Sequence, residues 1–172
     1  MPMGRLKNRI LAKLLTRFPK LLDRIVAATP ATAVKGTVPW TPVKKRLKDS
    51  TVALVTTAGV QLKGQPLFDM MDKDGDPTWR GLPSDTPKEA YTITHDYYDH
   101  TDADKDINIV FPIDRLREMR DAGLIGGLAR TNYGFMGHID GAHMETLVKK
   151  TAPEVARRLR REGVDVALLT PG

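Results

Sequence analysis

Four residues suited to metal or acid–base chemistry cluster near the middle of the chain: His95, Asp99, His100 and Asp104. Imidazole and carboxylate groups are suitable ligands for zinc, iron or manganese. Their spacing matches no standard metal motif. Three interpretations therefore stay open: a metal site, a hydrogen-bonded polar loop beside an active site, and a solvated acidic loop.

His138 is a second candidate, because it lies in a glycine-flanked loop, 137–141, just before a predicted helix. An imidazole that titrates near neutrality, among free helix amides, could act as a general acid or base or bind an anion; a plain turn residue is the alternative. Asp140 shares this loop. Thr56 and Thr57 end a predicted strand, where they could bond a substrate carboxylate or cap the following segment.

Several common catalytic signatures are absent from the sequence. It contains no G-x-G-x-x-G, no G-x-x-x-x-G-K-[ST] and no G-x-S-x-G, which leaves dinucleotide, P-loop and serine-hydrolase interpretations without support. These 172 residues include no cysteine, so they hold no disulfide, thiolate metal site or thiol nucleophile. We expect no cofactor and no metal within the chain.

The elements that must position these residues follow an alternating pattern. Apolar runs typical of strands buried in a parallel sheet occur at 51–56, 129–136 and 164–170. Helical periodicity occurs at 113–122 and 141–162, the second with a break near Pro153. This alternation predicts an α/β domain with a mainly parallel sheet and flanking helices, of Rossmann or flavodoxin type. The loops after the three strands should then meet at one edge of the sheet, where such folds bind ligands.

The remaining segments give weaker signals. Residues 91–94 and 107–111 are predicted to be short strands, whereas 63–88 show no helical or strand period and are expected to form a long loop.

The first 28 residues predict a basic amphipathic helix that Pro19 kinks or splits. Residues 1–24 carry seven cations and one acid, whereas the rest of the chain carries 20 residues of each sign. The basic pI therefore reflects this segment, and no nucleic-acid partner is expected. Its apolar stripe is expected to pack on the domain or on a partner subunit. The alternative, contact with an anionic membrane surface, is supported by composition alone.

Three segments follow from these patterns: the helix at 1–28, a proline-rich linker at 29–50, and an α/β domain at 51–172 whose carboxyl-terminal side is expected to be incomplete. No apolar run is long enough to span a bilayer, and no signal peptide is recognisable, so a cytoplasmic location is expected.

An ordered set of motifs between residues 38 and 172 resembles the glycine/sarcosine/betaine reductase selenoprotein B family, which includes the D-proline reductase selenoprotein subunit. The motifs are Val38-Pro39-Trp40-Thr41-Pro42, Val52-Ala53-Leu54-Val55-Thr56-Thr57-Ala58-Gly59, Thr94-His95 with Tyr98-Asp99, Asp106-Ile107-Asn108, Phe111-Pro112-Ile113-Asp114-Arg115-Leu116-Arg117, Gly134-Phe135-Met136-Gly137-His138-Ile139-Asp140-Gly141, and Val164-Asp165-Val166-Ala167-Leu168-Leu169-Thr170-Pro171-Gly172.

The resemblance implies an oxidoreductase subunit that reduces a small amine or amino acid with a disulfide/dithiol couple. It also implies partner reductase subunits, one with a pyruvoyl group, a thioredoxin-type reductant and an oligomer. The substrate-edge candidates are Thr56, Thr57, His95, Asp99, His138 and Asp140, chosen by their positions in the loops.

In this family a selenocysteine or cysteine motif follows a stretch like Leu168 to Gly172. Selenocysteine is encoded by UGA, so a reading frame translated with UGA as a stop would end just before that residue; a truncated paralogue and a fragment of a longer chain are the alternatives. The 172 residues alone are expected to lack selenol or dithiol catalysis, and to be poorly stable because the last strand lacks a covering helix.

The rival function is a non-catalytic α/β interaction module recruited through its N-terminal helix. A metal-dependent enzyme is the third hypothesis.

Overall fold

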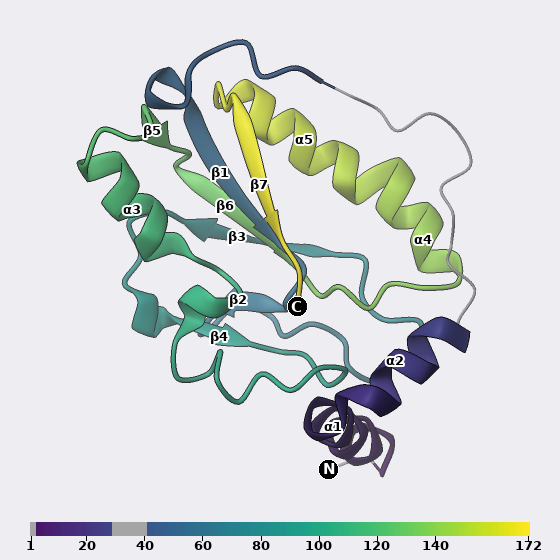
Figure 1. The fold of residues 1–172 in the computed structure, drawn as a ribbon. Helices are drawn as coiled ribbons and strands as arrows, with labels where there is room; N and C mark the ends of the chain where they lie inside the picture. Colours follow the sequence, from purple (N-terminus) through teal and green to yellow (C-terminus); the bar gives the residue numbers. More distant parts are fainter. Residues whose placement is uncertain (1–2, 29–40) are drawn as a thin grey trace.

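The computed structural model describes residues 3–28 and 41–172, and Figure 1 shows their arrangement. The predicted linker at 29–50 therefore lies outside the described residues up to position 40. The α-helices are α1 (Met3–Arg17), α2 (Pro19–Ala28), α3 (Ile113–Asp121), α4 (Ala142–Thr146) and α5 (Ala152–Arg161). The strands are β1 (Thr51–Thr56), β2 (Val60–Leu62), β3 (Trp79–Pro83), β4 (Tyr91–Ile93), β5 (Gly127–Leu128), β6 (Thr131–Phe135) and β7 (Val166–Thr170).

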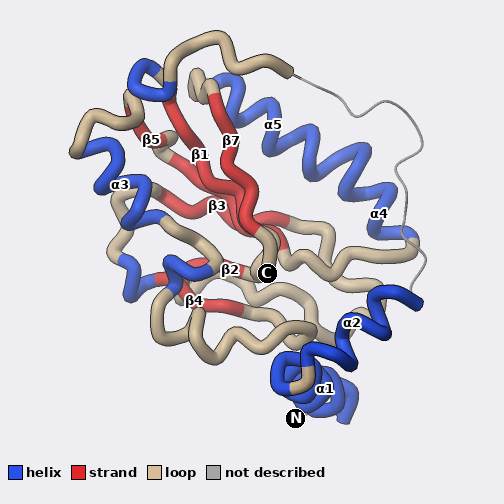
Figure 2. Tube along the Cα trace, viewed as in Figure 1, coloured by secondary structure: helices blue, strands red, loops and turns tan. Residues whose placement is uncertain are grey.

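Strand β1 organises the main sheet, because three parallel strands pair with it. β7 pairs along β1 from Val52↔Val166 to Thr56↔Thr170. β5 pairs with the beginning of β1, and β6 pairs with its end. β3 joins β6 antiparallel and makes the sheet mixed. The expected α/β class, with a mainly parallel sheet flanked by helices, is confirmed. Figure 2 shows these strands crossing the middle of the molecule, with a separate antiparallel pair, β2 and β4, below them.

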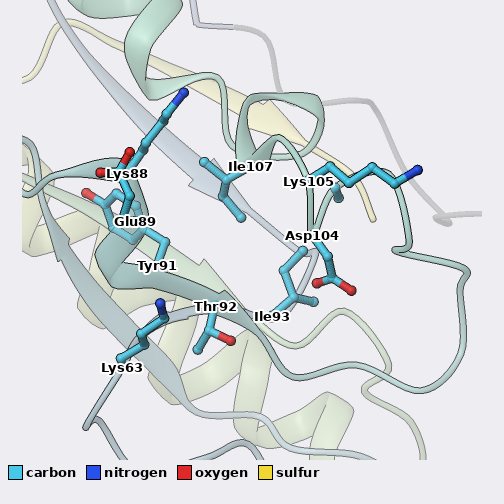
Figure 3. A pocket seen from close by; sticks show the side chains of 10 residues that line it. Lys63, Lys88, Glu89, Tyr91, Thr92, Ile93, Asp104, Lys105 and Ile107 are labelled. Atoms are coloured by element: carbon cyan, nitrogen blue, oxygen red, sulfur yellow. The ribbon is translucent and has the colours of Figure 1, made fainter.

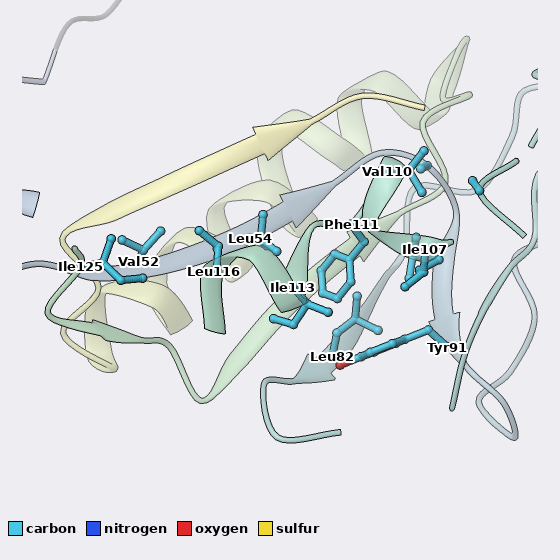
Figure 4. Close-up of a cluster of buried hydrophobic side chains, with 13 residues drawn as sticks. Val52, Leu54, Leu82, Tyr91, Ile107, Val110, Phe111, Ile113, Leu116 and Ile125 are labelled. Atoms are coloured by element: carbon cyan, nitrogen blue, oxygen red, sulfur yellow. The ribbon is translucent and has the colours of Figure 1, made fainter. Parts of the chain in front are cut away.

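The side chains of β1 alternate between two cores, as the strand period of two requires. Val52 and Leu54 pack in a cluster with Ile113 and Leu116 of α3, which Figure 4 shows around Phe111. Ala53 belongs to the second cluster, which lies under α5. The sheet is thus covered by α3 on one face and by α5 on the other.

Helix α3 follows its sequence signals closely. It begins after Pro112, buries Leu116, and is followed by Gly123 at φ 69°, a left-handed conformation that glycine adopts without a steric penalty. The helix predicted at 141–162 is also present, but as α4, a π-helical segment (Leu147–Thr151) and α5. The π segment lies just before Pro153, whose missing N–H and bulky ring disfavour regular α-helical bonding there.

Three sequence expectations are wrong. Residues 107–111 form no strand: Ile107–Ile109 is a short 3₁₀ helix whose cap is the Asp106 carboxylate, which accepts from Asn108 N–H. The expected loop at 63–88 contains strand β3. β7 pairs in parallel with β1 as expected, but it is not buried on both faces, because Leu168 is 42% exposed and Leu169 is 70% exposed.

The N-terminal segment is helical and splits at Pro19, as predicted. Packing of its apolar stripe on a partner subunit stays a prediction, and a different side of α1 faces the domain. The residues of α1 that lose exposure are Arg5, Asn8, Ala12 and Leu15, spaced three or four apart on one side of the helix. Among the apolar residues whose burial the structure describes, Leu15 is half-buried on this side, whereas Ile10, Leu11, Leu14 and Phe18 remain exposed. In the part of the chain that the structure describes, no helix has the length and apolar character needed to cross a bilayer.

Gln61 in β2 is fully buried, and within the described residues neither its amide oxygen nor its amide nitrogen has a hydrogen-bond partner. An unpaired buried polar group is destabilising. We expect Gln61→Met to raise the free energy of unfolding by about 1 kcal/mol in urea titrations. Gln65→Met is the matched control: its amide accepts from Leu62 N–H and donates to Gly81 O, each at 2.9 Å, so stability should fall. A loss for both variants would show that Gln61 is bonded.

Candidate functional site

The loops after β1, β6 and β7 meet at one edge of the sheet. Thr57 N–H donates to the carbonyl of Thr170 at 3.0 Å, and Gly59 N–H donates to that of Phe135 at 2.9 Å. A Cβ added to Gly137 would lie 2.2 Å from the Thr57 carbonyl oxygen, so the two loops touch through their backbones. Gly172 approaches Ala58 in the same way. Parallel strands bring their carboxyl ends together, and this gathering is what the alternation predicted.

A pocket of about 280 Å³ opens where these loops meet. Its lining combines the three loops with residues from the segment 95–98, which follows β4. The lining residues are Thr57, His95, Tyr97, Tyr98, Gly137, His138 and Gly172. Three of the six substrate-edge candidates, Thr57, His95 and His138, are thus brought together.

His95 is held as a neutral structural group. It is 8% exposed, and its Nδ1 accepts from Tyr97 N–H at 3.1 Å. Burial lowers the pKa of His95 to about 4, helped by the nearby His100 and His138 and opposed by a hydrogen bond to the backbone of Met136. With Nδ1 bonded to the backbone of Tyr97 and no charge at neutral pH, His95 anchors the loop that carries Tyr97 and is not suited to donate a proton.

His138 is better placed for proton transfer. Its Nε2 lies 2.9 Å from the carbonyl oxygen of Lys73, and a carbonyl accepts, so Nε2 is the donor, and in the neutral ring Nδ1 has the lone pair. The ring stacks on Tyr97 at a centroid distance of 4.0 Å. The bond to Lys73 fixes the tautomer, and the stacking on Tyr97 fixes the plane of the ring. In functional histidines the hydrogen bond of one ring nitrogen commonly sets the role of the other.

Tyr97 and Tyr98 line the pocket, and sequence reasoning did not select them. The Tyr98 hydroxyl donates to the carbonyl of Ala58 at 3.0 Å, and burial raises its pKa well above the ordinary range. Tyr98 is therefore neutral and structural. The two tyrosines follow His95 by two and three positions in the sequence, and aromatic residues within a candidate polar loop are the signal that could have identified them.

The other three candidates lie outside the pocket lining. Thr56 is fully buried beneath it, where its hydroxyl donates to Val110 O and accepts from Ala58 N–H. Asp99 accepts from the backbone and hydroxyl of Thr101, and these bonds hold its pKa below the ordinary value. Asp140 is exposed in its loop, where its carboxylate accepts from Gly141 N–H.

The four residues that could have bound a metal, His95, Asp99, His100 and Asp104, do not share one site. His100 Nδ1 bonds Asp104 at 2.8 Å, whereas His95 is turned into the pocket and Asp99 is engaged with Thr101. Across residues 3–28 and 41–172, no three histidine, aspartate or glutamate side chains are grouped to hold a metal ion. The hydrogen-bonded loop is the interpretation that this geometry favours.

A second hollow of about 350 Å³ lies between the β2–β4 pair and the loop before α3, and Figure 3 shows its lining. Lys88 and Lys105 extend away from its centre in this view, and Lys105 is paired with Asp102 at 2.7 Å. The lining of this hollow includes none of the substrate-edge candidates.

The fold and the pocket together define an α/β domain with a ligand-type pocket at the carboxyl edge of a mainly parallel sheet. The family model "Glycine/sarcosine/betaine reductase selenoprotein B" matches residues 20–172. The chain belongs to this family.

Curated relatives agree with the family match. The chain is 46% identical over 133 residues to D-proline reductase subunit gamma of Acetoanaerobium sticklandii, which covers 77% of this chain and 53% of that protein. It is 33% identical over 136 residues to glycine reductase complex component B subunit gamma of Carboxydothermus hydrogenoformans, covering 77% of this chain and 30% of that protein. The chain thus spans about half the length of the first relative and under a third of the second. No solved structure matches, so the likeness to Rossmann or flavodoxin folds stays a prediction.

Proposed function

We propose that this chain forms the substrate side of a reductase subunit that reduces a small amine or amino acid. The observation that carries the proposal is the position of Gly172, which lies in the pocket with Thr57 and His138. A selenocysteine or cysteine joined to Gly172, as the family pattern implies, would stand at this pocket. The family and the relatives' names support reductive chemistry.

The pocket offers the polar groups that a small amino acid needs. The Thr57 hydroxyl can donate to a carboxylate, and the lone pair on His138 Nδ1 can accept a hydrogen bond from an ammonium group or accept a proton from it. Reduction balances when a dithiol, or a selenol with a thiol, gives two electrons and two protons to the substrate and becomes a disulfide or selenenyl sulfide. The 172 residues contain no cysteine, so this couple must come from outside them.

A pyruvoyl group, if one is used, would belong to a partner subunit. The family resemblance implies this, and the carbonyl of such a group would react directly with the amine of the substrate. Two relatives are named as subunits of reductases, which supports such an assembly and an oligomer. A thioredoxin-type reductant for the couple is what the family resemblance implies.

The first test is the intact mass of the protein isolated from its source cells, with selenium measured on the same sample. A species well above 19.1 kDa that contains selenium or a cysteine pair supports the proposal. A 19.1 kDa species without either would overturn it and favour the interaction module.

The second test addresses His138 in the intact protein, assayed with its partner subunits, a dithiol, and D-proline, glycine, sarcosine or betaine. We expect His138→Gln to lower kcat/KM by about a hundredfold or more, as loss of a general acid or base does. His143→Asn is the control, because His143 bonds Asp72 outside the pocket and should leave turnover unchanged. Equal activity of the wild type and His138→Gln would remove His138 from the mechanism.

A further inference from the structure

Helices α1 and α2 lie at one end of the molecule, outside the body formed by the two sheets (Figure 1). Large apolar side chains remain exposed along them at helical spacing. We call this set the outer stripe: Leu6 at 48%, Ile10 at 59%, Leu11 at 44%, Leu14 at 43%, Phe18 at 53% and Leu21 at 39% exposed. Four of these residues line a shallow hollow together with Lys7. An apolar surface of this extent on a soluble domain marks an interaction site.

The polar side of α1 explains why the stripe faces outward. Nε and Nη2 of Arg5 donate to the two carboxylate oxygens of Asp96, which is 4% exposed. Arg9 and Lys13 line a narrow hollow with Asp99 and other residues of the acidic loop. The buried Ala12 lies on this same side of α1. The basic side is thus attached to the domain, and the apolar side is presented to solvent.

Further cations flank the outer stripe. Within the described residues, Lys7, Arg17, Lys20 and Arg24 make no ion pair, and Asp23 is the one acidic residue among positions 1–24. A partner for this surface must therefore be apolar at its centre and negatively charged around it. The family match begins at residue 20, so nearly all of α1 lies outside the part shared with the family.

We propose that the outer stripe docks this protein on an anionic lipid bilayer. The helices would lie in the interface, with the stripe among the acyl chains and the four flanking cations at the headgroups. The Arg5–Asp96 attachment holds the polar side of α1 against the domain, so the domain, with its pocket, would stand on the water side. Interfacial binding of this kind needs no spanning helix.

The test is flotation of the full chain with vesicles of pure phosphatidylcholine and of an equimolar phosphatidylcholine and phosphatidylglycerol mixture. We expect binding to the anionic vesicles that weakens as salt is added, and at least about tenfold weaker binding to the neutral ones. Ile10→Glu with Leu14→Glu should remove binding, and Lys7→Gln with Arg17→Gln and Lys20→Gln should weaken it by about tenfold or more.

The matched control is Ile109→Glu with Val148→Glu, which changes two exposed apolar residues elsewhere, 61% and 62% exposed, by the same charge. It should bind anionic vesicles like the wild type. Absence of wild-type binding, or equal loss in the control, would overturn the proposal. So would a wild-type dimer that Ile10→Glu with Leu14→Glu converts to a monomer without a change in vesicle binding, because the stripe would then be covered by a second copy.

Discussion

Replacing Gly137 with alanine is expected to lower the free energy of unfolding by about 3 kcal/mol or more. Two costs combine at this position. Gly137 has φ 94°, a conformation that costs an L residue about 1–2 kcal/mol. Its new Cβ would also stand 2.2 Å from the carbonyl oxygen of Thr57, and a backbone atom cannot move aside as a flexible side chain can. Urea titration at neutral pH measures the change.

Gly64 provides the matched control for this prediction. It has nearly the same backbone conformation, φ 92°, but a Cβ added there would meet nothing within 4 Å. Gly64→Ala should therefore show the conformational cost alone, about 1 kcal/mol. Equal losses in the two variants would mean that the loops after β1 and β6 do not touch as closely as described. A larger loss at Gly137 would confirm that the pocket depends on this contact.

The sequence predicts the elements whose local signals agree with their tertiary surroundings. β1 has a continuous apolar run and is buried between α3 and α5. α3 has Pro112 at its beginning and Gly123 at its end, and both serve as expected. The meeting of the three loops follows from topology alone, since parallel strands point the same way. These signals were enough to place Thr57 and His138 at one edge.

The wrong predictions concern elements whose structure depends on residues far away in the sequence. β3 contains Gly81 and Pro83, which weaken a strand signal, yet it pairs along β6 from Trp79↔Phe135 to Pro83↔Thr131. The apolar composition of β7 predicts a buried strand, and it does not reveal that Leu169 is exposed. The periodicity of α1 identifies two faces but not which one packs. That choice follows from Asp96, a residue 91 positions from its partner Arg5.

Protonation of His95 is expected to destabilise the fold strongly as the pH falls. The ordinary pKa of histidine is 6.5, and burial lowers that of His95 to about 4. Between these values the unfolded chain binds a proton at this residue and the folded chain does not. The stability that neutral His95 contributes is therefore complete above pH 6.5 and is lost as the pH falls to 4, by about 3 kcal/mol in total.

His95→Asn isolates this effect, because the Asn oxygen can still accept from Tyr97 N–H as Nδ1 of His95 does. The free energy of unfolding of both proteins is measured at pH 7.5 and at pH 4.5. The change with pH in the variant is then subtracted from the change in the wild type, which cancels the titration of the carboxylates that both proteins share. We expect the variant to be less stable at pH 7.5 but to lose about 2–3 kcal/mol less on acidification. An unchanged pH dependence would mean that His95 is protonated as easily in the folded chain as in the unfolded one. The distinction matters for the site, because a His95 that stays neutral at physiological pH leaves His138 as the pocket's proton-transfer candidate.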